Sequence, residues 1–173
     1  MRAIWTRLAL GIATLALATG AANAACDFLT GGGFIIVNKD KANFGVAGGC
    51  KNDSNSTPDW GHLEYIDHGI GLNVHWTSIT GYSQDPTSPS NTRFICGTAR
   101  TNLYGDVNFV VRAKDGEPGV MDEFDITLSS MPPYSTFTTG PHQLSGGNIE
   151  LHNPNRSTTG NFGPASCGPG GIA

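Results

Sequence analysis

Four acidic side chains lie at or just after one glycine-rich turn of the sequence, and they are well suited to bind a metal ion. Asp115 and Glu117 belong to the turn Asp-Gly-Glu-Pro-Gly, and Asp122 and Glu123 follow it. Carboxylate oxygens on loops suit a hard cation such as calcium. Aspartate is also a common turn residue where no ion binds, and the spacing differs from that of an EF-hand loop. Asp115 and Asp122 are therefore the candidate calcium ligands, with an ion-free turn as the alternative.

A second set of side chains could bind sugars, because exposed aromatic rings can stack on sugar rings in a carbohydrate-binding module. Trp76 alternates with Val74 along one predicted strand, which favours a core position. Trp60, close to Pro58 at the entry to a strand, and Tyr82 are the candidate ligand-binding residues. A binding module requires both rings to be exposed together on one face. The alternative is that Trp60 closes the edge of the core.

The histidines do not form a recognisable catalytic pattern in the sequence. They are His62, His68, His75, His142 and His152. His62 and His68 are six residues apart, about 20 Å along a strand, so they cannot share one ion. Asp67 and His68 are adjacent, and neighbouring residues of a strand point to opposite faces, which prevents a hydrolase dyad. We predict a non-catalytic protein, with a small secreted hydrolase as the less favoured alternative.

The first 24 residues have the features of a secretory signal peptide. Two arginines precede an apolar run over residues 8–18, and the small residues Ala-Asn-Ala follow at 22–24. We predict cleavage after Ala24; lipidation of Cys26 is the alternative, disfavoured by Asn23. The apolar run is shorter than the about 20 residues of a membrane-spanning helix. The protein is therefore predicted to be secreted or extracytoplasmic, in the periplasm, on the cell surface or in the medium, without a membrane span.

The charge of the predicted mature chain argues against nucleic acid as a partner. Cleavage removes two arginines and leaves 10 − 2 = 8 basic residues against 14 acidic ones, a net charge of −6. Binding to phosphates requires clustered lysines and arginines, and here they are scattered singly among acids. An extracellular polysaccharide or a surface protein is the kind of partner that we expect.

The four cysteines predict two disulfides. Cys26, Cys50, Cys96 and Cys167 all lie after the predicted cleavage site. An even number of cysteines in an exported chain favours disulfides over free thiols or a metal site. Three pairings are possible, and spacing does not decide among them. We favour Cys50 with Cys96 and Cys26 with Cys167, because the second bond would tie both ends of the chain to the domain.

The elements that would position these side chains are strands. Short apolar and β-branched runs alternate with clusters of Gly, Pro, Asn and Asp, which is the strand-and-turn pattern. Eight strands are expected, at residues 34–37, 42–47, 62–66, 72–79, 92–101, 107–113, 123–129 and 148–152. One all-β domain over residues 25–152 follows, an antiparallel β-sandwich or partly open barrel stabilised by disulfides. Residues 153–173, rich in Gly, Pro, Ser and Thr, predict a flexible tail pinned at Cys167.

Three connections predict antiparallel hairpins. The polar residues 38–41 and the glycine and proline turn at 115–119 each join two predicted strands. The third connection is Gly-Ile-Gly at 69–71. A three-residue loop there would pair Ile66 with Val74 and Tyr65 with His75.

Four motifs in order resemble one known type of domain. They are Thr-Gly-Gly-Gly-Phe at 30–34, Ala-Asn-Phe-Gly at 42–45, Gly-His-Leu-Glu-Tyr-Ile-Asp-His-Gly-Ile-Gly-Leu-Asn-Val-His at 61–75, and Gly-Gly-Asn-Ile-Glu-Leu-His at 146–152. The chain is similar, over residues 27–152, to the post-choice-of-anchor-P type domain of secreted and surface bacterial proteins. The resemblance implies an extracellular β-rich module, often repeated in longer surface proteins, and it implies no catalytic residues.

Together these patterns predict an exported, non-catalytic module with a structural or adhesive role at or outside the cell envelope. A carbohydrate-dependent or calcium-dependent binding module is the alternative. No cofactor other than calcium is expected.

Overall fold

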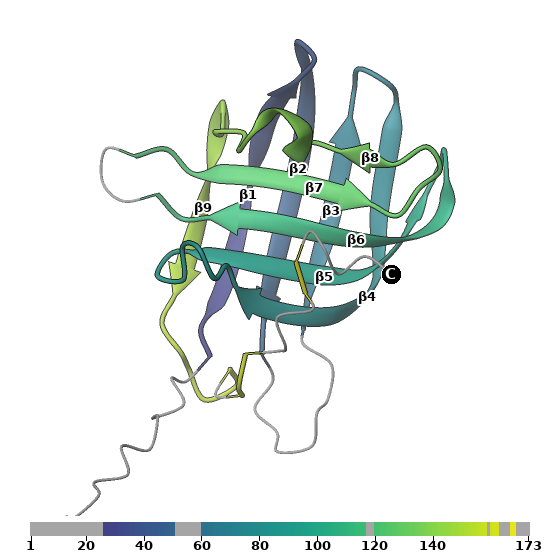
Figure 1. Ribbon diagram of the computed structural model, residues 1–173. Coiled ribbons are helices and arrows are strands. Elements are labelled where there is room, and N and C mark those ends of the chain that lie inside the picture. The colour runs from purple at the N-terminus through teal and green to yellow at the C-terminus, as the bar shows by residue number, and fades with distance from the viewer. Residues whose placement is uncertain (1–25, 51–59, 117–119, 159, 163–166, 169–173) are drawn as a thin grey trace, which may run out of the picture.

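Among the residues that the structure describes, the strands form a single antiparallel sheet of nine. The computed structural model describes residues 26–50, 60–116, 120–158, 160–162 and 167–168. The strands are β1 (Phe28–Val37), β2 (Asp40–Gly49), β3 (Trp60–Asp67), β4 (Leu72–Gln84), β5 (Thr92–Thr101), β6 (Gly105–Lys114), β7 (Glu123–Leu128), β8 (Tyr134–Ser135) and β9 (Gly146–His152), with a short 3-10 helix η1 (Phe137–Thr139). Their order is β8-β7-β6-β5-β4-β3-β2-β1-β9, and the sheet does not close into a barrel (Figure 1).

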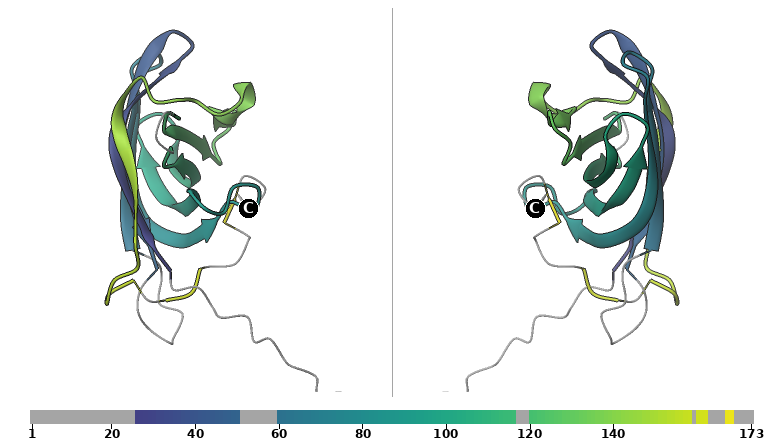
Figure 2. Two further views of the ribbon diagram at one scale, coloured as in Figure 1. Left: turned by 90° about the vertical axis from the view of Figure 1, so that its left-hand side faces the viewer. Right: turned by 90° about the vertical axis from the view of Figure 1, so that its right-hand side faces the viewer.

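The sheet bends at β4 into two layers that face each other. Strands β9, β1, β2 and β3 form the back layer, and β5 to β8 run across them in front (Figures 1 and 2). Strand β3 pairs with β4 only over residues 64–67, whereas β4 pairs with β5 along most of its length. Bulges between Trp76 and Ser78 and between Ile79 and Gly81 interrupt that ladder. Because a bulge bends and twists its strand, β4 can leave the back layer and enter the front one.

The core lies between the two layers. Phe44 of β2 stacks on Phe124 of β7 with ring centroids 3.9 Å apart, so the two layers are in direct contact. Inward residues alternate with outward ones along each strand, as in Leu63, Tyr65 and Asp67 of β3, which are buried. The prediction of an all-β antiparallel fold is confirmed, and each of the eight expected strands is present.

Two of the hairpin predictions are confirmed, and the third has the wrong register. Strands β1 and β2 meet at a two-residue turn in which Asn38 and Lys39 have φ of 51° and 78°. Strands β6 and β7 pair around the turn at 115–119, of which 117–119 lie outside the described residues.

The β3–β4 loop has four residues instead of the predicted three, so Tyr65 pairs with Val74 and Glu64 with His75. Asp67 Oδ1 accepts a hydrogen bond from the Gly69 amide, and Gly71 has a φ of 68°. These two features close the longer turn, because glycine adopts positive φ without steric cost.

The predicted disulfide pairing is wrong, although all four cysteines are paired. The disulfides join Cys26 to Cys50 and Cys96 to Cys167, with Cα atoms 5.9 and 5.6 Å apart. Cys26 precedes β1 and Cys50 follows β2; these strands are partners, so the two cysteines lie at the same end of one hairpin. Two disulfides are typical of extracytoplasmic proteins.

The described part of the C-terminal tail lies against the domain. The Cys26 amide donates a hydrogen bond to the Gly160 carbonyl, and Phe162 stacks on Tyr82 with ring centroids 5.9 Å apart. Cys167 is held by its disulfide, as predicted for this residue. The predicted signal peptide lies outside the described residues. Where the structure describes the chain, none of its helices has the length and hydropathy needed to cross a bilayer.

Candidate functional site

A row of three rings crosses the outer surface of the back layer. Phe28 of β1 lies directly opposite His152 of β9 on one side and Gly49 of β2 on the other, and Gly49 lies opposite Trp60 of β3. The Phe28 and His152 rings are stacked with centroids 4.5 Å apart, and the Phe28 and Trp60 centroids are 6.0 Å apart. All three side chains are half-buried. The register of four strands therefore brings together rings that are far apart in the sequence.

The absence of a side chain at Gly49 allows the rings to approach each other. A Cβ atom at this position would lie 2.7 Å from the Phe28 Cβ, 3.0 Å from Trp60 Nε1 and 3.2 Å from Trp60 Cε2. The indole ring thus lies over the Gly49 backbone.

Polar side chains lie on the same surface as the row. Thr30 Oγ1 and His152 Nε2 are joined by a hydrogen bond of 2.8 Å, and Glu150 Oε1 lies 3.7 Å from His152 Nδ1. Glu64 forms an exposed ion pair with His75. We call this surface the open face; its members are Phe28, Thr30, Trp60, Glu64, Glu150 and His152.

Trp60 belongs to the open face, but Tyr82 does not. Tyr82 is fully buried, and its hydroxyl donates a hydrogen bond of 2.9 Å to Asp27 Oδ1. Burial, together with the charge of Asp27, raises the pKa of the Tyr82 hydroxyl far above its ordinary value. The predicted pair of exposed rings is therefore wrong for Tyr82, and the neighbours of Trp60 are Phe28 and His152, which the sequence analysis did not select.

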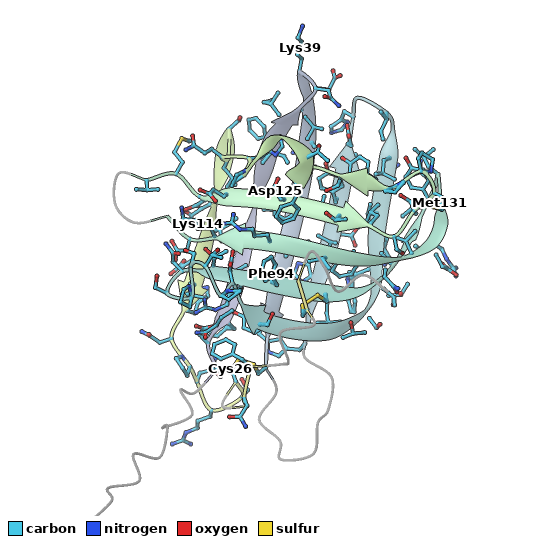
Figure 3. All side chains as sticks on the ribbon, viewed as in Figure 1. Cys26, Lys39, Phe94, Lys114, Asp125 and Met131 are labelled. Atoms are coloured by element: carbon cyan, nitrogen blue, oxygen red, sulfur yellow. A yellow bond between two sulfur atoms is a disulfide. The ribbon has the colours of Figure 1, made fainter. Side chains whose placement is uncertain are left out.

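The outer surface of the front layer differs from the open face because other parts of the chain cover it. The side chains of Phe94, Cys96, Val110 and Cys167 form a buried cluster there, with Phe137 of η1 packed against it. Ser83 Oγ donates a hydrogen bond of 2.8 Å to the Cys167 carbonyl. The Cys96–Cys167 disulfide thus holds the tail over this layer (Figure 3).

The same covered surface contains an aspartate and a histidine in contact. Asp125 is fully buried, and its Oδ1 lies 2.8 Å from His142 Nδ1 and accepts a 2.9 Å hydrogen bond from Thr136 Oγ1. Burial raises the pKa of the Asp125 carboxyl, although the hydrogen bonds from His142 and Thr136 act in the opposite direction. This pair orients the His142 ring and attaches residue 142 to β7. No motif relates the two residues, so the sequence analysis missed them.

Asp67 and His68, the adjacent pair considered as a hydrolase dyad, have separate partners. Asp67 Oδ2 accepts a hydrogen bond of 2.8 Å from Tyr134 Oη inside the core. His68 Nε2 lies 3.0 Å from Asn43 Oδ1 on the surface. Asp67 is the last residue of β3 and His68 the first of the loop, and their partners lie in the core and on the surface, so the two side chains do not form a dyad.

The candidate calcium ligands lie side by side along the free edge of β9. Asp122 Oδ2 accepts a hydrogen bond of 2.6 Å from the Ile149 amide, and Asp115 Oδ2 accepts one of 2.8 Å from the Leu151 amide. Asp122 Oδ1 accepts a further bond of 2.9 Å from the Gly116 amide. These carboxylates satisfy backbone donors that an edge strand would otherwise leave unpaired. Among the described residues, no group of three or more His, Cys, Asp or Glu side chains is arranged to hold a metal ion.

Asp122→Asn is expected to lower the free energy of unfolding by about 1–3 kcal/mol. The carboxylate accepts hydrogen bonds from two backbone N–H groups, and the NH2 group of asparagine would face one of these donors with a donor of its own. Urea unfolding in EDTA measures this change, and Asp106→Asn, at an exposed ion pair, is the control with a small effect. If Asp122→Asn destabilises the protein only when calcium is added, the carboxylate serves an ion rather than β9.

Comparison with known protein families, curated proteins and solved structures finds no match for this chain. The resemblance to the post-choice-of-anchor-P type domain stays a prediction.

Proposed function

We propose that this protein is an exported, non-catalytic module that acts in adhesion at or outside the cell envelope, and that it binds its partner through the open face. One observation carries the proposal. The ring row of Phe28, Trp60 and His152 is only half-buried, whereas the outer surface of the front layer is covered by η1 and the tail.

The composition of the open face supports a role in binding. Large rings bordered by polar side chains provide apolar contact area together with hydrogen-bonding groups, as protein recognition surfaces do. These side chains are not part of the core between the layers. They contact one another around His152, which also shares a hydrogen bond with Thr30. The two disulfides support an extracytoplasmic location.

A charge reversal on the open face tests this proposal without assuming the chemistry of the partner. Beads coated with the oxidised protein are allowed to settle on extracellular matrix prepared from the producing cells, and retention under flow is measured. The variant Glu64→Lys with Glu150→Lys is expected to reduce retention several-fold, because both glutamates are exposed on this face. Met131→Lys is the control for an added positive charge away from this face, since Met131 is 88% exposed on the turn between β7 and β8 (Figure 3).

Equal retention of the double variant and the wild-type protein would contradict the proposal. A loss of retention by the Met131→Lys control would also contradict the proposal, because binding would then depend on overall charge.

A further inference from the structure

We infer that the ligand of the open face is a neutral polysaccharide, whose sugar rings pack on Trp60 beside Phe28. This inference rests on the proposed function and adds the chemical class of the partner.

The ring row and the polar side chains beside it match the two sides of a sugar. A sugar ring has an apolar face of C–H bonds and a rim of hydroxyl groups. The indole of Trp60 lies against Gly49 and is only half-buried, so part of this flat apolar ring is accessible to the C–H bonds. Thr30 and Glu150 lie two residues further along their strands from Phe28 and His152, about 7 Å away. Their oxygens can therefore reach the hydroxyl groups of the same ligand.

The length of the ring row favours a polymer over a single sugar. The row crosses from β9 through β1 and β2 to β3, which are three strand spacings of about 4.8 Å each. That span exceeds one sugar ring, so the face suits a chain of sugars. On the same surface, four residues from Gly49 and about 13 Å away along β2, Gly45 has no atom within 4 Å of where a Cβ would lie. The sheet surface there is open, and a polymer can cross it without meeting a side chain at this position.

The charge of the open face favours a neutral ligand. The chain carries a formal net charge of −4 at pH 7. On the open face, Glu150 lies two residues from His152, and Glu64 lies four residues from Trp60. A polyanion would be repelled by this arrangement. A neutral polymer has no such cost, and carboxylates are good acceptors for its hydroxyl groups.

Affinity electrophoresis on native gels tests the inference. The oxidised protein is run through gels that contain hydroxyethylcellulose, soluble starch, laminarin or alginate. We expect at least one of the three neutral polymers to retard the protein, and Trp60→Ala to weaken the apparent affinity for it by about tenfold or more. Phe28→Ala should also weaken it, and Trp60→Phe should retain part of it because a ring remains. Met131→Ala is the control that keeps full retardation, and thermal unfolding confirms that each variant is folded.

Three outcomes would overturn the inference. They are no retardation by any neutral polymer, equal retardation of the Trp60→Ala variant, and retardation by alginate alone. These results are separable from the bead experiment. If charge reversal at Glu64 and Glu150 abolishes bead retention while no neutral polymer retards the protein, the open face binds a partner of another class and only the inference about polysaccharide fails.

Discussion

Asp27→Asn is expected to lower the free energy of unfolding by about 3–5 kcal/mol, because it leaves a buried guanidinium without its counter-charge. The Arg93 side chain is 2% exposed and forms a two-pronged ion pair with Asp27, whose side chain is 15% exposed. The other Arg93 donors face the carbonyls of Pro89 and Thr92 at 2.7 and 2.8 Å. Urea unfolding of the oxidised protein measures the change.

The chain contains its own control for this prediction. Arg100 and Asp106 form an ion pair of similar geometry, but both side chains are 71% exposed. Exposed pairs contribute little because water and salt screen them. Asp106→Asn should therefore leave the unfolding midpoint nearly unchanged. A similar small effect for Asp27→Asn would show that Arg93 finds another partner or reaches solvent.

Replacement of both Cys96 and Cys167 by alanine removes their disulfide. It is expected to lower the free energy of unfolding by about as much as Asp27→Asn does. The two cysteines are 71 residues apart in the sequence. The loop-closure relation gives about 4 kcal/mol for a closed loop of that size, through the larger conformational freedom of the unfolded chain. The variant also releases the tail that covers Phe94 and Val110. Equilibrium unfolding with and without the disulfide measures the difference.

The second disulfide provides the comparison. Cys26 and Cys50 are 24 residues apart, for which the same relation gives about 3.5 kcal/mol. Both double variants should therefore be clearly destabilised. Peptide mapping under non-reducing conditions should find Cys26 linked to Cys50 and Cys96 linked to Cys167. A peptide that links Cys50 to Cys96 would contradict the structure and this prediction together.

Much of the strand pattern could be read from the sequence, because alternation and turn residues are local signals. The exceptions were β8, which has only two residues, and the start of β1, where glycines mask the pattern. Those glycines have a packing reason. A Cβ at Gly31 would lie 2.7 Å from Ile149 Cγ1, and one at Gly33 would collide with the Gly146 carbonyl of β9. Residues that look like a loop in isolation are therefore a strand because of a neighbour more than 100 positions away.

Of the candidate site, Trp60 was predicted to lie on the surface, and Tyr82 was placed there wrongly. The predicted strand stopped at residue 79, whereas β4 continues to Gln84. Each of the two bulges in β4 shifts the alternation by one residue, and together they return Tyr82 to the inward side, like Val74 and Trp76. The only signal in the sequence that Tyr82 points inward was its even spacing from Val74 and Trp76, and that signal applies only if one strand continues to residue 82.

By itself, the sequence determined the properties that depend on neighbouring residues: the all-β class, most strands, two of the three predicted hairpins, and the expectation that all four cysteines pair. Tertiary structure decided the bend of the sheet at β4, the partners of the cysteines and the composition of the open face. Phe28, Trp60 and His152 meet only because four strands hydrogen-bond in one particular register. That register is selected by the whole core, since a shift of one residue would turn every inward side chain of a strand outward. Local patterns do not contain this long-range choice.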